Sequence, residues 1–335
     1  AEASVCVNIL DDVDGKWQSI AEYQYSCSDI DIIDFVHNKD GAVSIAIGYV
    51  TGLSQKVLDV YEYEEKKLNL VYQINYTKLY VCDADSDGID EMMVFNNNYA
   101  GHTSNVQVVE PDKDFEITAV VEMQPDISEI SNITSAVTED GFILYIDEIK
   151  VSNMMNTEVL KFLDGKVENL TYAPENEKVV ETLRTNGIYS DDIDLDAKIE
   201  IPCASVFLGY EAVEKDKQEN AIQWLVVNGD ELSRKYYSYY NITDGYMFLF
   251  PERWVGRVTV RIDSRTDEAV FVKYEGDNIY VMKELMRIKS MPKGIELPKE
   301  FENYQSISQD SENDFYVKLS SDEQEPLVLT STEAS

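Results

Sequence analysis

The sequence predicts a mainly β protein in which a unit of about four strands is repeated. Two observations predict this fold class. Short apolar runs alternate with Asp-Gly and Asn-Gly turns along most of the chain, and acidic turns recur about every fifty residues. The chain has 335 residues, 44% of them hydrophobic, which is enough to bury a sizeable core. No apolar run approaches the length of a transmembrane helix.

Hairpins are the first repeated element. In each, two apolar runs flank a short polar turn, such as Asp164-Gly165 or Asn228-Gly229, and this is a typical hairpin signal. The predicted hairpins cover residues 5–25, 57–74, 106–123, 157–172 and 222–240. Short helices are expected only at 176–186, where apolar residues have helical spacing, and at 211–218, which is alternatively a charged loop.

Acidic turns alternate with the hairpins. Their fifth residues are Asp40, Asp87, Asp140, Asp196 and Asp244, at intervals of 47, 53, 56 and 48 residues. A period near fifty with about four strands per unit is typical of propeller blades. The sequence therefore predicts an irregular β-propeller of about five blades over residues 1–245. The alternative is an acidic β domain in which similar turns recur by chance.

One acidic turn, residues 83–91, has the ligand pattern of a calcium loop. Carboxylates occupy loop positions one, three, five and nine, and Gly88 at position six permits the sharp turn. Ca²⁺ takes about six to eight oxygen ligands. An EF-hand is excluded because strand-like runs flank the loop and its twelfth position is Val94. The predicted ligands are the side chains of Asp83, Asp85, Asp87 and Glu91 and the carbonyl of Ile89.

The fourth copy retains carboxylates in the same register, but Ala197 replaces the glycine. A residue with a Cβ atom at positive φ costs energy, so we predict a second, weaker site here. Its ligands would be Asp192, Asp194, Asp196 and Glu200. The copies at Asp40, Asp140 and Asp244 lack the outer ligands and are predicted to be structural turns.

The Asp-x-Asp-x-Asp-Gly-x-x-Glu loop between two strands resembles the FG-GAP or VCBS repeats of integrin-α-type β-propellers. It is also similar to loops of propeller-like surface lipoproteins of Gram-positive bacteria. The resemblance covers roughly residues 5–250. It implies a calcium ion bound by the loop at 83–91 and a binding or structural module on the outer cell face. The chain begins Ala-Glu-Ala, as expected of a mature or trimmed fragment, and a lipid anchor upstream is compatible with that start.

Residues 246–335 do not follow the fifty-residue period. The pattern in 246–254, a strand followed by proline, an acidic residue, a basic residue and tryptophan, is weakly similar to Mog1/PsbP-like modules. That similarity implies a small C-terminal α+β segment. Alternatively, 246–250 is the last propeller strand and pairs with the N-terminal hairpin 5–25, so that the two regions share strands.

Cysteine and histidine offer little material for catalysis. We expect the four cysteines to be buried free thiols, although a Cys6–Cys27 bridge stays open; the other two are Cys82 and Cys203. The only histidines are His37 and His102, and no nucleophile elbow, phosphate loop, zinc motif or dinucleotide fingerprint occurs. A non-catalytic role is favoured.

The charge of the chain restricts its partners. The formal net charge is −36, which would repel nucleic acids and anionic membrane surfaces. Tyrosines near residues 236–240, with Trp224, either form an exposed binding surface or pack within the sheet. The sequence therefore predicts an extracytoplasmic calcium-binding module, at the cell surface or secreted, with a protein or glycan partner. The alternative is a secreted glycan-acting hydrolase or lyase that uses Asp/Glu chemistry.

Overall fold

A computed structural model describes residues 4–51, 54–64, 67–97, 103–276, 278–322 and 324–334, with the side chain of Asp40 outside this description. His102 also lies outside the described residues. Strands dominate: within the described residues, the helical elements are single 3₁₀ turns and the helix α1 (Ser331–Ala334). The mainly β prediction is confirmed. No helix among the described residues is long and apolar enough to cross a membrane.

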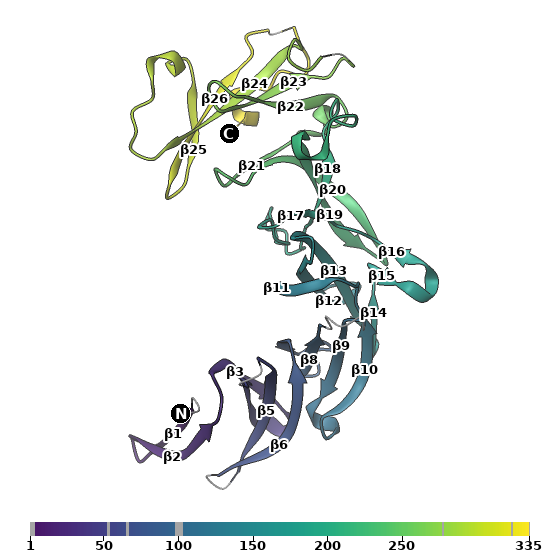
Figure 1. Cartoon of the computed structure of the whole chain (residues 1–335), viewed down its shortest axis with the longest axis vertical. Helices are drawn as coiled ribbons and strands as arrows, with labels where there is room; N and C mark the ends of the chain where they lie inside the picture. The colour runs from purple at the N-terminus through teal and green to yellow at the C-terminus, as the bar shows by residue number, and fades with distance from the viewer. Residues whose placement is uncertain are drawn as a thin grey trace. The chain divides into compact units, whose positions relative to one another are not determined.

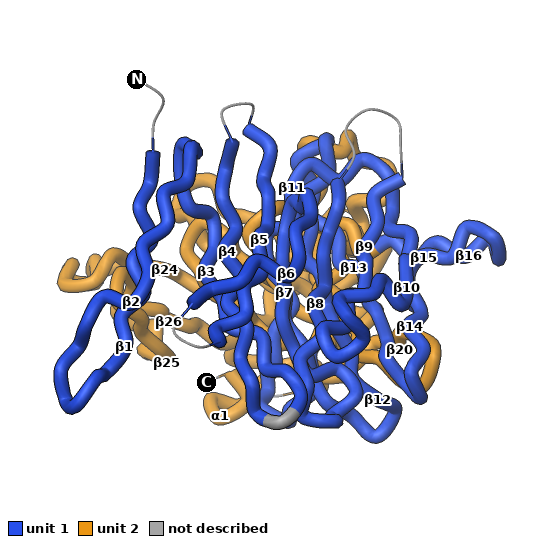
Figure 2. The backbone as a smooth tube through the Cα atoms, turned by 90° about the horizontal axis from the view of Figure 1, so that it is seen from below, with its two compact units in different colours: residues 1–181, 190–199 blue, residues 182–189, 200–335 orange. Residues whose placement is uncertain are grey.

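Backbone contacts divide the chain into two compact units, coloured separately in Figure 2. The first comprises residues 1–181 and 190–199, and the second comprises residues 182–189 and 200–335. The boundary predicted after residue 245 lies inside the second unit, between two paired strands of one sheet.

The first unit consists of successive antiparallel sheets, which can be followed in chain order in Figure 1. The N-terminal hairpin is a separate two-stranded sheet, β1 (Val5–Val13) and β2 (Lys16–Tyr25). A four-stranded sheet follows: β3 (Asp29–His37), β4 (Val43–Val50), β5 (Lys56–Glu64) and β6 (Lys67–Tyr76). The next contains β7 (Lys78–Cys82), β8 (Glu91–Asn96), β9 (Asn105–Glu110) and β10 (Glu116–Glu122). Then come β11 (Ile127–Thr138), β12 (Gly141–Lys150), β13 (Met154–Leu163) and β14 (Lys166–Asn169), and a small pair, β15 (Tyr172–Ala173) and β16 (Lys178–Val179).

The second unit contains two further antiparallel sheets. The first comprises β18 (Ile201–Val206), β19 (Asn220–Asn228), β20 (Glu231–Asn241) and β21 (Tyr246–Leu249). The second has the order β22–β23–β24–β26–β25: β22 (Val258–Asp263), β23 (Glu268–Lys273), β24 (Glu284–Pro292), β25 (Gln305–Gln309) and β26 (Asn313–Leu319). The short β17 (Arg184–Thr185) lies beside β18, where the Ala204 N–H donates to the Leu183 carbonyl.

Strand β8 explains how neighbouring sheets pack in the first unit. Side chains alternate between the two faces of a strand, and both faces of β8 are buried. Met92 and Val94 belong to a core that also contains side chains of the β3–β6 sheet. Met93 and Phe95 belong to a second core with side chains of the β11–β14 sheet. The β7–β10 sheet is thus enclosed on both sides.

The helix predicted at 176–186 is wrong, and at 211–218 the charged-loop alternative is confirmed. Residues 176–186 form no helix, but the end of a 3₁₀ turn followed by β16 and β17. The β-branched Val179, Val180 and Thr182 favour extended backbone, and the fully buried Arg184 donates to the carbonyls of Thr182 and Ile188. Residues 211–218 form a loop with one 3₁₀ turn.

The C-terminal segment is not α+β. From residue 246 onward the described residues form strands, with α1 and 3₁₀ turns as the helical elements. In β26 the side chains of Phe315 and Val317 are buried in the core and their neighbours are less buried, and such alternation is typical of a strand. Strand β21 pairs with β20, because the Asn241–Gly245 turn reverses the chain tightly: the Gly245 N–H donates to the Asn241 carbonyl at 2.9 Å. This pairing replaces the alternative in which residues 246–250 join the N-terminal hairpin.

All four cysteines are free. Cys27 is buried and Cys82 and Cys203 are half-buried, but Cys6 is exposed, contrary to the expectation. Cys6 lies on β1 of the two-stranded hairpin, where every second side chain points outward.

The aromatic cluster near residue 237 largely packs inside the second unit. Trp224 and Tyr239 are buried, and the Trp224 indole N–H donates to the Ser238 hydroxyl. The ring centroid of Phe207 lies 6.0 Å from that of Tyr237 and 6.5 Å from that of Tyr239. Packing within the sheet is therefore the better interpretation of these side chains.

Substitution of Gly141, in the β11–β12 turn, tests how closely β12 packs beside β13. Gly141 has φ +117, and a Cβ atom there would lie 2.3 Å from the Phe162 carbonyl oxygen on β13. We expect Gly141→Ala to lower the free energy of unfolding by about 2 kcal/mol or more, through backbone strain and the clash. Chemical denaturation measures the change.

Gly165→Ala is the matched control. Gly165 also has positive φ, +69, but nothing lies within 4 Å of its added Cβ atom. Its cost should be about 1 kcal/mol, from the backbone conformation alone. Equal costs for both variants would contradict the close packing of β12 on β13.

Candidate metal centre

The predicted calcium loop joins β7 to β8, and its own carboxylates fix its backbone. The Asp83 carboxylate accepts the N–H groups of Asp87 and Gly88, both at 3.0 Å. The Asp87 carboxylate accepts the Ile89 N–H at 2.8 Å. Ser86 and Gly88 have positive φ, 64° and 86°. Side chains that satisfy the N–H groups of a turn stabilise it locally, so the loop conformation is encoded within the loop.

Three carboxylates of this loop converge. Asp83, Asp85 and Glu91 each offer an oxygen atom, and these atoms all lie within 4.8 Å of one another. Glu91 is buried, whereas Asp85 is exposed. Asp87, also a predicted ligand, is not in this group. The donors are hard oxygens on a flexible loop, which suits Ca²⁺ better than a soft-ligand metal.

The pKa of Glu91 is raised by burial first and by neighbouring carboxylates second. Burial raises this pKa to about 7, the N–H of Ala84 opposes the rise, and the charges of Asp85, Asp83 and Asp87 add to it. Burial and the charge of Asp87 raise the pKa of Asp85 as well. Ionised carboxylates this close repel one another, and a bound dication would remove that repulsion. The donor set therefore fits a divalent cation.

The eighth loop residue fixes the loop to the preceding sheet. The Asp90 carboxylate lies 2.7 Å from both the backbone N and the ring Nδ1 of His37 at the end of β3. The Asp90 N–H donates in turn to the His37 carbonyl at 2.9 Å. Nothing in the sequence spacing indicated this contact, which joins residues 53 positions apart.

The second acidic loop, residues 192–200, has the same internal hydrogen bonds. The Asp192 carboxylate accepts the N–H groups of Asp196 at 3.0 Å and Ala197 at 2.8 Å, and the Asp196 carboxylate accepts the Lys198 N–H at 3.0 Å. Leu195 and Ala197 have φ 63° and 67°, matching Ser86 and Gly88. Ala197 thus adopts the backbone conformation that favours glycine. The carboxylates that converge here are Asp192, Asp194 and Glu200.

A lysine distinguishes the second loop from the first. Nζ of Lys235, on β20, lies 2.8 Å from Oε1 of the fully buried Glu200. This ammonium group already neutralises one of the carboxylates that a cation would need. The Lys235 contact and the strained Ala197 are two physical reasons for weaker metal binding at this loop.

The remaining acidic turns contain no group of three converging carboxylates among the described residues. At Asp140 the turn is closed by Thr138, whose hydroxyl accepts the Asp140 N–H. At Asp244 the Asn241 carboxamide both donates to the Asp244 carboxylate and accepts its N–H. The side chain of Asp40 lies outside the described residues.

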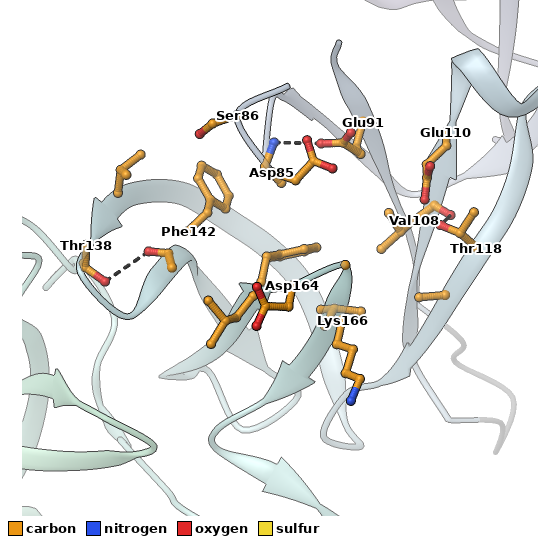
Figure 3. Close-up of a pocket in the computed structure, with 18 residues that line it drawn as sticks. Asp85, Ser86, Glu91, Val108, Glu110, Thr118, Thr138, Phe142, Asp164 and Lys166 are labelled. Atoms are coloured by element: carbon orange, nitrogen blue, oxygen red, sulfur yellow. Dashed lines mark hydrogen bonds between the residues drawn. The ribbon is translucent and has the colours of Figure 1, made fainter. Parts of the chain in front are cut away.

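A pocket of about 450 Å³ adjoins the first loop, within the first unit (Figure 3). Asp85 and Glu91 line it beside the loop. Val108, Glu110 and Thr118 come from β9 and β10, and Phe142 and Phe162 come from β12 and β13. Asp164 and Lys166, at the β13–β14 turn, complete its rim. The sequence did not single out this pocket, because its lining comes from hairpins far apart in the chain.

Two glutamates inside the β11–β14 sheet form a separate acidic pair. Glu148 and Glu158 are fully buried, and burial raises the pKa of both. The Lys150 ammonium lies 2.9 Å from Glu148, and the Asn169 carboxamide donates to Glu158 at 2.5 Å. Neither glutamate lines the pocket described above. A pair shielded in this way has no access to a substrate.

Neither the known protein-family models nor the curated proteins match this sequence. Among solved structures, a rhamnogalacturonan lyase of Bacillus licheniformis is similar over 80% of this chain, with 12% identity and a TM-score of 0.38. The chain spans 63% of that lyase's length. The periplasmic gluconolactonase of Pseudomonas aeruginosa is similar over 85% of this chain and 77% of its own, with 13% identity and a TM-score of 0.33. At these TM-scores, neither likeness carries an inference about activity.

The sixth loop position is expected to control the stability of both acidic loops. Gly88→Ala should lower the free energy of unfolding by about 1 kcal/mol, because a Cβ atom is unfavourable at φ +86 even where nothing lies within 4 Å. Ala197→Gly should have the opposite sign, since it removes the same strain at φ 67. Chemical denaturation of both variants in EDTA measures these effects without a metal contribution. The same sign for both would contradict the equivalence of the two loops.

Proposed function

We propose that the loop at 83–91 binds Ca²⁺ and that the protein is an extracytoplasmic binding or scaffold module, at the cell surface or secreted, for a protein or glycan partner. The observation that carries this proposal is the convergence of Asp83, Asp85 and Glu91 on a backbone fixed by internal hydrogen bonds. Ile89 and Asp87 would supply further oxygens. Calcium sites of extracellular modules bind weakly, which suits a loop whose Asp85 is open to solvent.

The proposed role of the cation is structural. Glu91 is the first residue of β8, whose next residues lie in two cores, and Asp90 contacts β3. A cation held by Asp83, Asp85 and Glu91 would therefore stabilise the start of a central strand. Its charge would also offset both the burial of Glu91, which is the main cause of its raised pKa, and the repulsion from the neighbouring carboxylates.

We further propose that the chain is an FG-GAP/VCBS-like propeller of about five irregular blades. Support comes from antiparallel sheets of four or five strands in the described residues after the N-terminal hairpin. Four of them end by residue 249, and the fifth, β22–β26, lies outside the residues 1–245 for which the blades were predicted. In the first three of them, the acidic turn joins the first two strands. At Asp244 the turn joins the last two strands of the fourth sheet, so the repeat is out of phase there.

A glycan-acting hydrolase or lyase is the second candidate, and one observation favours it: Glu110 and Asp164 line the same pocket. Such enzymes need a carboxylic acid that stays protonated near neutral pH. Burial would raise the pKa of Glu110, but hydrogen bonds from Lys113 and Thr118 outweigh it and the pKa is lowered. Glu110 is thus suited to accept hydrogen bonds and not to donate a proton. The carboxyl of this pocket whose pKa is raised to about 7 is Glu91, and a cation bound at the loop would hold it ionised, which favours the binding role.

Calcium should raise the melting temperature of the EDTA-treated protein. At a calcium concentration 100-fold above Kd, binding adds about 2.7 kcal/mol, which corresponds to roughly 5–11 °C for a unit of this size. Mg²⁺ should have a smaller effect, because it demands stricter geometry and retains its water. Differential scanning calorimetry measures both.

Asp83→Asn and Glu91→Gln should each remove most of the calcium-dependent rise, because each replaces a charged ligand by a neutral one. Asp140→Asn is the matched control: it alters an exposed acidic turn outside both clusters and should leave the rise intact. Glu200→Gln tests the second loop and should have a smaller effect. A melting curve unaffected by EDTA would overturn the proposed metal site.

A further inference from the structure

We propose that the pocket beside the loop at 83–91 binds a neutral carbohydrate. This inference rests on the proposed function and specifies its partner as a glycan. The pocket lies wholly within the first unit, and its volume of about 450 Å³ is in the range of small-molecule sites.

Apolar side chains form one part of the lining. Phe142 and Phe162 contact each other edge to face, with ring centroids 5.8 Å apart, and both line the pocket. Val108 and Val167 extend the apolar surface. The C–H face of a sugar ring packs well on such a surface, because aromatic faces are electron-rich and weakly hydrated. A fully polar ligand would leave this area without a partner.

Carboxylates dominate the polar part of the lining. Lys166 is its basic residue, against the acidic set Asp85, Glu91, Glu110 and Asp164. Among the described residues, the exposed Asp164 carboxylate has no hydrogen-bond partner, and Glu110 is held ionised by Lys113 and Thr118. Ionised carboxylates accept hydrogen bonds from hydroxyl groups and repel anions. The lining thus favours neutral sugars over acidic sugars, nucleotides and other phosphorylated ligands.

The pocket and the metal loop share two residues. Asp85 and Glu91 belong to the converging carboxylates and also line the pocket, as Figure 3 shows at one end of the cavity. A bound cation would neutralise these two charges and order the loop, and would thereby change the part of the pocket lining that the sugar contacts. Binding at the two sites is therefore coupled. An ordered loop should strengthen sugar binding, and by linkage the sugar should strengthen cation binding by the same factor.

The test uses the full chain and ligand-observed saturation-transfer NMR with four probes: methyl α-mannoside, methyl β-galactoside, methyl α-fucoside and glucuronate. We expect at least one neutral glycoside to bind, and EDTA to weaken that binding about fivefold or more. Phe162→Leu should weaken it about fivefold, since it keeps an apolar side chain and removes the aromatic face. Asp164→Asn, at an exposed turn residue, should weaken it without lowering the melting temperature.

Phe35→Leu is the matched control, because Phe35 is 55% exposed on β3 and does not line the pocket. An equal loss in this variant, or stronger binding of glucuronate than of the glycosides, would overturn the inference. Absence of glycoside binding while calcium still raises the melting temperature would overturn the sugar site and leave the metal site standing. Glycoside binding that Phe162→Leu weakens, without any calcium-dependent rise, would support the pocket and refute the metal site.

Discussion

Burial of both faces of β8 is the constraint on which the first unit depends. A strand of six residues supplies Met92 and Val94 to one core and Met93 and Phe95 to another, so three sheets are packed through it. Its first residue, Glu91, is also a member of the converging carboxylates. The cores and the candidate metal centre therefore share one short segment of backbone. A change in the conformation of the loop therefore acts directly on the core, because Glu91 and Met92 are adjacent residues.

The same turn chemistry produces two loops with different electrostatics. In both, an aspartate at the first position accepts the N–H groups of the fifth and sixth residues, and two residues take positive φ. These local bonds make the conformation largely independent of the surrounding sheet. Both Glu91 and Glu200 face two other carboxylates, but Glu200 also has the ammonium group of Lys235 as a partner.

Much of the fold could be predicted from the sequence, because its signals are local. Hairpin turns such as Asp164-Gly165 and the alternation in β1 specify neighbouring strands, and the Asp-x-Asp-x-Asp-Gly spacing specifies a loop that closes on itself. The mainly β class and the convergence of Asp83, Asp85 and Glu91 follow from such signals. Contacts between sheets do not follow from such local signals. The helix predicted at 176–186 failed because the burial of Arg184 outweighs helical spacing. The pocket and the His37–Asp90 contact were missed because they join distant segments.

Lys235 has a consequence for how this chain would respond to its surroundings. A covalently attached ammonium group is present at fixed stoichiometry, whereas a bound dication follows the concentration of free ion. If the loop at 83–91 binds Ca²⁺ as proposed, its close carboxylates would have no cation between them in calcium-poor medium, whereas Glu200 of the loop at 192–200 would keep Lys235 as its partner. Dependence on the external ion would therefore be strongest in the β3–β10 region and weaker at the start of the β18–β21 sheet.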